Sequence, residues 1–114
     1  MESCPFCRVA EGKAQARVVF DGDEVLAFHD IAPRAPVHVL VIPRRHIVSL
    51  AHTSQGDRDL LGTLLAAAAE AARQTGIADS GYRVVANSGA EGGQTVAHLH
   101  LHVLGGRPMG WPPG

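Results

Sequence analysis

The chain has 114 residues, of which 46% are hydrophobic and 18% charged, and its formal net charge is −1. This composition predicts one folded domain spanning residues 1–114 and excludes an intrinsically disordered chain. A nearly neutral chain has no basic surface for a nucleic-acid polymer or an anionic membrane, so a phosphate-bearing ligand would have to be bound locally. No apolar run resembles a signal peptide or a bilayer-spanning segment, and we therefore expect a cytoplasmic protein.

The N-terminal half is predicted to contain one short helix and three strands. Glycine and proline residues mark the boundaries of these elements, because they end helices and strands or form turns. The expected elements are a helical turn at residues 4–11 closed by Gly12, strands at 17–20 and 24–29 joined by the turn 21–23, and, after a loop from Pro33 to Pro36, a buried β-branched strand at 37–42 stopped by Pro43.

The C-terminal half is predicted to contain one long helix and two strands. Between residues 57 and 75, leucines and alanines recur at helical spacing, and Gly76 is placed to end the helix. Strands are expected at 82–86 and 97–104, on either side of a glycine-rich loop. The predicted fold class is therefore α+β: an antiparallel five-stranded sheet with one long helix and a short N-terminal helix.

The last predicted strand carries the most informative pattern, the run HLHLHV at residues 98–103. Because side chains two apart in a strand share a face, three imidazoles would lie on one face and aliphatic groups on the other. The preceding loop, residues 87–95, contains three glycines whose backbone N–H groups can turn toward an anion. A hairpin loop that needs positive φ angles is the plainer interpretation of those glycines, but their position beside the imidazoles favours a phosphate cradle.

Two separated segments carry a resemblance to a known family. The segment FHDIAPRAPVHVLVIPRRHI at residues 28–47, together with residues 82–114, resembles the Hint branch of the histidine-triad (HIT) nucleotide-binding proteins. The C-terminal residues 105–114 resemble Hint rather than the diadenosine-polyphosphate hydrolases. The resemblance covers nearly the whole chain and implies a HIT-like fold, a homodimer, and hydrolysis of a purine nucleoside 5'-phosphoramidate to the nucleoside monophosphate and an amine, with no cofactor required for catalysis.

The resemblance also assigns the catalytic histidines. It implies that His100 attacks the α-phosphorus to form a covalent nucleotidyl-histidine, and that His102 contacts the phosphate oxygens. His98 is the first histidine of the triad, and His38 is the separate upstream histidine of the site. Histidine suits nucleophilic catalysis because a neutral ring nitrogen is available near pH 7, and two successive displacements have lower barriers than one. Taken alone, His38 would be interpreted as a satisfied histidine in an apolar strand.

The remaining site residues follow from the same resemblance. Asp30 would accept hydrogen bonds from the ribose hydroxyls, as a carboxylate is suited to do. The C-terminal Trp111 would contact the leaving group bound to the partner subunit, or would anchor the tail. The nucleotide contacts implied are Phe6, Val9, Phe28 and Ile31 around the purine, which would otherwise be ordinary core, and Asn87, Gln94 and Thr95 around the α-phosphate.

The pair Cys4-x-x-Cys7 is half of a tetrahedral zinc site. Some histidine-triad relatives bind structural zinc with such a pair and two histidines, which implies that His46 and His98 complete a site for Zn²⁺ here. The alternative is two thiols without a metal.

Other functional classes stay open beside the phosphoramidate hydrolase. They are a dinucleoside polyphosphate hydrolase that uses the same triad, a nucleotide-binding or scaffolding module with incidental catalysis, and a protein whose histidines and cysteines serve zinc alone.

Overall fold

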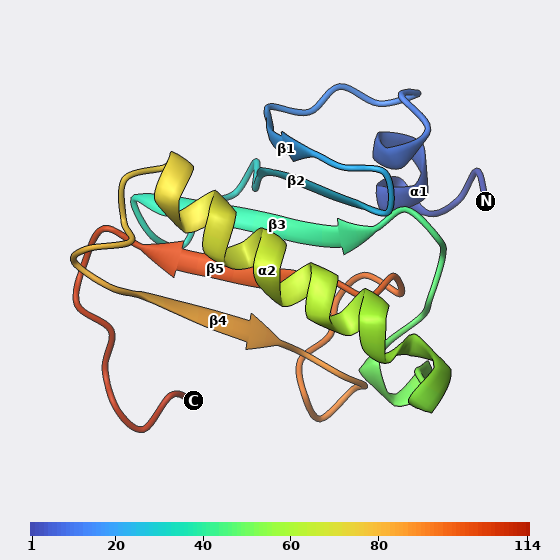
Figure 1. The fold of residues 1–114 in the computed structure, drawn as a ribbon. Helices are drawn as coiled ribbons and strands as arrows, with labels where there is room; N and C mark the ends of the chain where they lie inside the picture. Colours follow the sequence, from blue (N-terminus) through green and yellow to red (C-terminus); the bar gives the residue numbers. More distant parts are fainter.

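The computed structural model describes residues 1–114 and contains one antiparallel sheet of five strands in the order β1-β2-β3-β5-β4 (Figure 1). The predicted fold class is confirmed, and element boundaries agree to within a few residues apart from the last strand. The elements are α1 (Pro5–Ala10), β1 (Val18–Asp21), β2 (Val25–His29), β3 (Val37–Pro43), 3₁₀ turns at Leu50–His52 and Gln55–Asp57, α2 (Arg58–Gln74), β4 (Tyr82–Ala86) and β5 (Leu101–Gly105). No helix in the structure is both long and apolar enough to cross a membrane.

Helix α2 lies across one face of the sheet, as Figure 1 shows, and builds the larger core. Its alanines let the helix backbone approach the strands closely, and Leu64 is buried against them. Burial of one leucine contributes about 1.5–3 kcal/mol. The aliphatic residues of the histidine run, Leu99, Leu101 and Val103, all lie in this core. The aliphatic side of the predicted alternation is therefore confirmed, whereas only His102 of the three histidines lies within β5.

The opposite face of the sheet is only partly covered. Helix α1 packs there near the C-terminal end of β3 and forms a smaller core with Phe28, Leu40 and Ile42. The rest of this face remains open, and His102, paired in the ladder with Leu40, lies on it. The sheet face under α2 therefore forms the main core, and the opposite face is accessible for a functional site.

The last strand begins at Leu101 and not at Ala97, so that prediction of its start was wrong. The cause lies in the neighbouring strand β3, which ends at Pro43, a residue without a backbone N–H to donate. The segment before Leu101 therefore leaves the ladder, and the backbone N–H of Leu99 donates to the carbonyl oxygen of Ile47 at 2.6 Å. This departure frees the backbone of His98 for another role.

Candidate active site

A cavity of about 570 Å³ lies on the open face of the sheet. Its walls come from α1 and the segment after it, from the end of β2, the following loop and the first half of β3, and from β5 with the segment that leads into it. Three of the four histidines predicted as catalytic line it, whereas His98 lies behind them, fully buried. The cavity-lining residues named in the sequence analysis are Phe6, Val9, Phe28, Asp30, Ile31, His38, Thr95, His100 and His102.

His100 is held in one tautomer by the backbone. Its Nδ1 lies 2.8 Å from the carbonyl oxygen of His98, which accepts its proton, so the lone pair resides on Nε2. The structure uses the carbonyl two residues earlier, which is free because the segment is outside the ladder. The ring of Phe6 packs edge-on against His100 with centroids 5.1 Å apart, so the buried imidazole has a fixed orientation.

A chain of hydrogen bonds assigns the protons of the other two cavity histidines. The backbone N–H of Arg34 donates to Nδ1 of His38 at 3.1 Å, so His38 carries its proton on Nε2. That Nε2–H lies 2.9 Å from Nδ1 of His102, which must accept it. Neutral His102 therefore carries its own proton on Nε2, as a donor.

The electrostatics keep His102 neutral. Burial, with smaller contributions from the neighbouring His100 and His38, lowers the pKa of His102 to about 4. Burial also lowers the pKa of His38, although the carboxylate of Asp30 opposes this. The cavity thus offers a free ring nitrogen on His100 and a neutral N–H on His102, the pair that phosphoryl transfer needs for attack and for charge stabilisation.

Asp30 is the only acidic residue lining the cavity. One carboxylate oxygen accepts the backbone N–H of Ala32 at 2.8 Å, and the other lies 3.4 Å from Nε2 of His38. Asp30, His38 and His102 approach closely enough to hold a cation. However, a metal on Nε2 of His38 would displace the proton that the Arg34 contact places there, so we interpret the trio as a hydrogen-bond relay.

The apolar part of the cavity matches the predicted base site. Phe6 and Phe28 meet edge to face with centroids 5.7 Å apart, and both are buried. Ile31, in contrast, is 98% exposed on the rim, which is not the position of a core residue.

Three of the residues predicted to contact the nucleotide or its leaving group lie outside the cavity. Gln94 donates to the carbonyl oxygens of Val48 and Val96, and Asn87 donates to that of Gly92, so both amides organise the glycine-rich loop. Trp111 is 84% exposed in the C-terminal tail. Arg34 is among the cavity residues that sequence reasoning missed, because nothing in its spacing distinguishes it from a solvent-exposed arginine.

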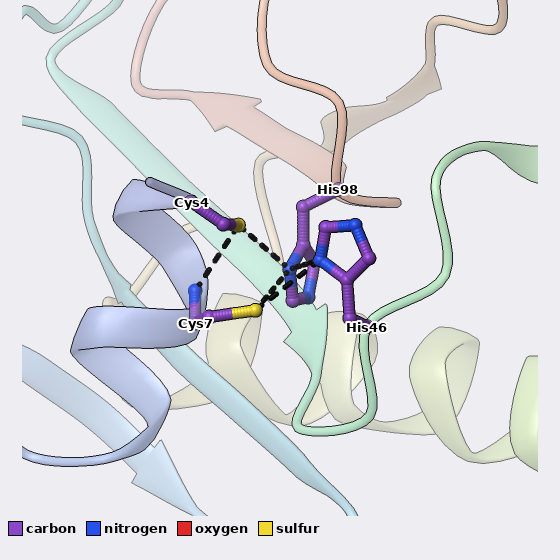
Figure 2. A group of neighbouring side chains, drawn as sticks. All are labelled: Cys4, Cys7, His46 and His98. Carbon is purple, nitrogen blue, oxygen red and sulfur yellow. Dashed lines mark hydrogen bonds between the residues drawn. The ribbon is translucent and has the colours of Figure 1, made fainter. Parts of the chain in front are cut away.

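The predicted metal ligands converge from three parts of the chain, as Figure 2 shows. Cys4 and Cys7 belong to the start of α1, His46 follows β3, and His98 precedes β5. Three pairs of ligand atoms lie 3.2 Å apart: Cys4 Sγ with His98 Nδ1, Cys7 Sγ with His46 Nδ1, and His46 Nδ1 with His98 Nδ1. The fourth contact, between Cys7 Sγ and His98 Nδ1, is 3.5 Å long. Tetrahedral zinc requires roughly 3.3–3.6 Å between such sulfur and nitrogen atoms.

Hydrogen bonds with the neighbouring backbone leave the ligand atoms of this cluster able to bind a cation. Nε2 of His98 donates to the carbonyl oxygen of Pro43 at 2.8 Å, which leaves the lone pair of Nδ1 directed at the sulfurs. The backbone N–H of Cys7 donates to Sγ of Cys4 at 3.3 Å, a contact that favours a thiolate. Burial and the nearby Cys4 raise the pKa of Cys7 to about 11, so without a metal this thiol stays protonated. The four side chains therefore fit a divalent metal such as zinc.

Comparisons with known proteins identify the family. The HIT domain family model matches residues 11–109. A protein of Synechocystis sp. described as an uncharacterized HIT-like protein is 49% identical over 113 residues, covering 99% of this chain and 98% of that protein. A HIT family hydrolase from Legionella pneumophila superposes with a TM-score of 0.95 at 46% identity, covering 98% of this chain and 100% of that chain. A zinc-bound histidine triad family protein from Mycobacterium smegmatis gives a TM-score of 0.78 at 33% identity, covering 93% and 76% of the two chains. The chain therefore belongs to the HIT domain family.

Proposed function

We propose that the protein is a hydrolase of the Hint branch that cleaves purine nucleoside 5'-phosphoramidates, releasing the nucleoside monophosphate and an amine. The observation that carries the proposal is the tautomer of His100, whose Nδ1–H is held by the His98 carbonyl while Nε2 keeps its lone pair beside the cavity. The relationship to a protein named a HIT family hydrolase supports it.

The reaction proceeds in two displacements. In the first, Nε2 of His100 forms a bond to the α-phosphorus, the bond from phosphorus to the amine nitrogen breaks, and the amine leaves with one proton taken from the solvent. The ring becomes a nucleotidyl-imidazolium whose Nδ1–H remains bonded to the His98 carbonyl. In the second, water attacks phosphorus, the bond to Nε2 breaks, and one proton is released. The Nε2–H of His102 stabilises the phosphoryl oxygens in both steps.

The nucleoside is accommodated by the other end of the cavity. Asp30 accepts hydrogen bonds from the ribose hydroxyls, and the base lies among Phe6, Val9, Phe28 and Ile31. Thr95 contributes a hydroxyl near the α-phosphate. Because Asn87 and Gln94 are occupied within the glycine-rich loop, their contribution is to hold that loop.

The turnover of an adenosine 5'-phosphoramidate tests the proposal, with diadenosine polyphosphate as a parallel substrate. We expect hydrolysis by the wild type and a loss of about 10³-fold or more in His100→Ala, because the nucleophile is absent. His52→Ala is the matched control, since His52 is an exposed histidine outside the cavity. Faster cleavage of the polyphosphate would favour the dinucleoside polyphosphate hydrolase. An inactive wild type that binds nucleotide would favour the binding module.

We also propose that Cys4, Cys7, His46 and His98 hold a structural Zn²⁺. The zinc would supply no step of the reaction, only a cross-link. Its ligands connect α1, which carries Phe6, with the segment whose His98 carbonyl orients His100. The fit of the ligand distances and the zinc-bound relative support this assignment.

A homodimer is the proposed assembly. Strand β4 is the edge of the sheet, and its exposed Tyr82 and Val84 lie on the α2 side, since Val84 pairs with Val103 of the main core. Leu65 of α2 is 57% exposed. An unpaired edge beside exposed apolar side chains favours association with a second copy. Sedimentation should report a dimer, and Val84→Asp should shift the mass toward the monomer.

A further inference from the structure

Arg34 is a cavity residue that the proposed mechanism does not use through its side chain. It lies in the loop between β2 and β3, and its backbone is tied on both sides. Its N–H donates to Nδ1 of His38 at 3.1 Å, and its carbonyl oxygen accepts from the Arg107 guanidinium at 3.0 Å. The start of the Arg34 side chain is therefore fixed relative to the cavity histidines.

The charge of Arg34 is uncompensated. Its guanidinium forms no ion pair and no hydrogen bond in the structure, whereas Arg8, the other arginine that lines the cavity, pairs with Glu2 at 3.3 Å. Burial is the main cause of the lowered pKa of His38. The carboxylate of Asp30 raises this pKa, and the positive charge of Arg34 lowers it further. A free positive charge thus lies within electrostatic range of the phosphate end of the cavity.

The depth of the site places the leaving group near this charge. His100 is 4% exposed and lies at the bottom of the cavity, while Arg34 is exposed at its mouth. In an in-line displacement the leaving group departs on the side of phosphorus opposite the nucleophile. With His100 below the phosphorus, the leaving group points toward the mouth, and Arg34 is one of the exposed residues that line this mouth.

We propose that Arg34 gives the site a preference for leaving groups that carry their own negative charge, as a carboxylate or a phosphate does. This inference rests on the proposed phosphoramidate hydrolysis and deepens it by naming the class of amine. An arginine is suited to the role because its planar guanidinium is always charged and binds both anions in a bidentate manner.

Matched substrates test the inference. Adenosine 5'-phosphoramidates of alanine and of alaninamide have nearly the same shape and differ in one charge, and that of 1-aminoethylphosphonate replaces the carboxylate of alanine by a phosphonate. For the wild type we expect kcat/KM to be about two- to fivefold higher for alanine than for alaninamide, the range for an exposed charge pair. This ratio should fall to about one in Arg34→Gln and stay partly elevated in Arg34→Lys.

Two controls separate charge selection from a structural effect. The ratio should be unchanged in Arg58→Gln, an exposed arginine at the start of α2, on the other face of the sheet. Added salt should reduce the ratio in the wild type and leave it constant in Arg34→Gln, because screening acts only on the charged pair. The phosphonate substrate shows whether carboxylate or phosphate is preferred.

A binding measurement does not depend on turnover. The β-phosphate of adenosine diphosphate occupies the leaving-group position, so calorimetry should show tighter binding of the diphosphate than of the monophosphate, and Arg34→Gln should lose this difference. Hydrolysis of all substrates with a ratio unaffected by Arg34→Gln would overturn the inference while the proposed function stands. A wild type that neither hydrolyses nor binds these nucleotides would overturn both.

Discussion

Removal of the zinc site has the largest predicted effect on stability. The two cysteines and two histidines of the proposed zinc site come from α1, the segment after β3 and the segment before β5, and no disulfide joins these segments. Free zinc at 1,000 times its Kd would stabilise the folded chain by about 4 kcal/mol, because zinc binds the folded site and not the dispersed ligands. For a chain of this size, that corresponds to a rise in Tm of roughly 12–20 °C.

The assay combines metal analysis with scanning calorimetry. The wild type should contain one zinc per chain, and chelation should lower its Tm by the amount above. Co²⁺ substitution should give the visible absorption of a tetrahedral thiolate site. Cys7→Ser and His46→Asn should lose both the metal and the chelator effect, whereas His52→Asn should retain them, since His52 bonds only with Ser49. Metal-free wild type, or an equal chelator effect in Cys7→Ser, would refute the four-ligand site.

Two further predictions concern the cavity. Asp30→Asn should lower kcat/KM for the ribonucleoside phosphoramidate about tenfold, the effect of losing a charged hydrogen-bond acceptor, with little change for the matching 2',3'-dideoxy substrate; equal losses on both substrates would remove Asp30 from ribose recognition. The lowered pKa of His102 makes a prediction for stability. Its folded pKa of about 4 lies below the unfolded value of 6.5, so unfolded chains bind more protons between these values and stability falls as the pH drops from 6.5 toward 4. After a discount for solvent screening, His102→Asn should reduce the loss of unfolding free energy between pH 7 and 5 by about 1 kcal/mol, measured by urea denaturation; an identical pH dependence in both proteins would contradict a neutral, half-buried His102.

The fold was predictable where one physical effect dominated. The alternation of aliphatic residues and histidines identified both faces of β5, because burial against α2 acts on every second side chain. The start of that strand was not predictable from its own residues. It depends on Pro43 in the adjacent strand, which cannot extend the ladder, and this pairing exists only in three dimensions.

The candidate site, like the fold, was predictable from the sequence only in part. The metal ligands and most cavity residues came together as the resemblance implied, because the segments that carry them are the ones that resemble the family. The carbonyl that orients His100 and the proton assignment of His102 depend on backbone geometry, which residue types do not encode. Asn87 and Gln94 face the loop instead of the cavity because the turns after β4 leave backbone groups that need partners.

The central claim is that His100 carries the nucleotide during catalysis. Its most direct test is mass spectrometry of protein quenched in base during turnover of an adenosine 5'-phosphoramidate, followed by peptide mapping at neutral or alkaline pH, because acid cleaves the bond between phosphorus and imidazole nitrogen. The account predicts one adenylyl group on the peptide containing His100, and none in His100→Ala. Active wild type with no adenylylated peptide, or with the group on another residue, would contradict it.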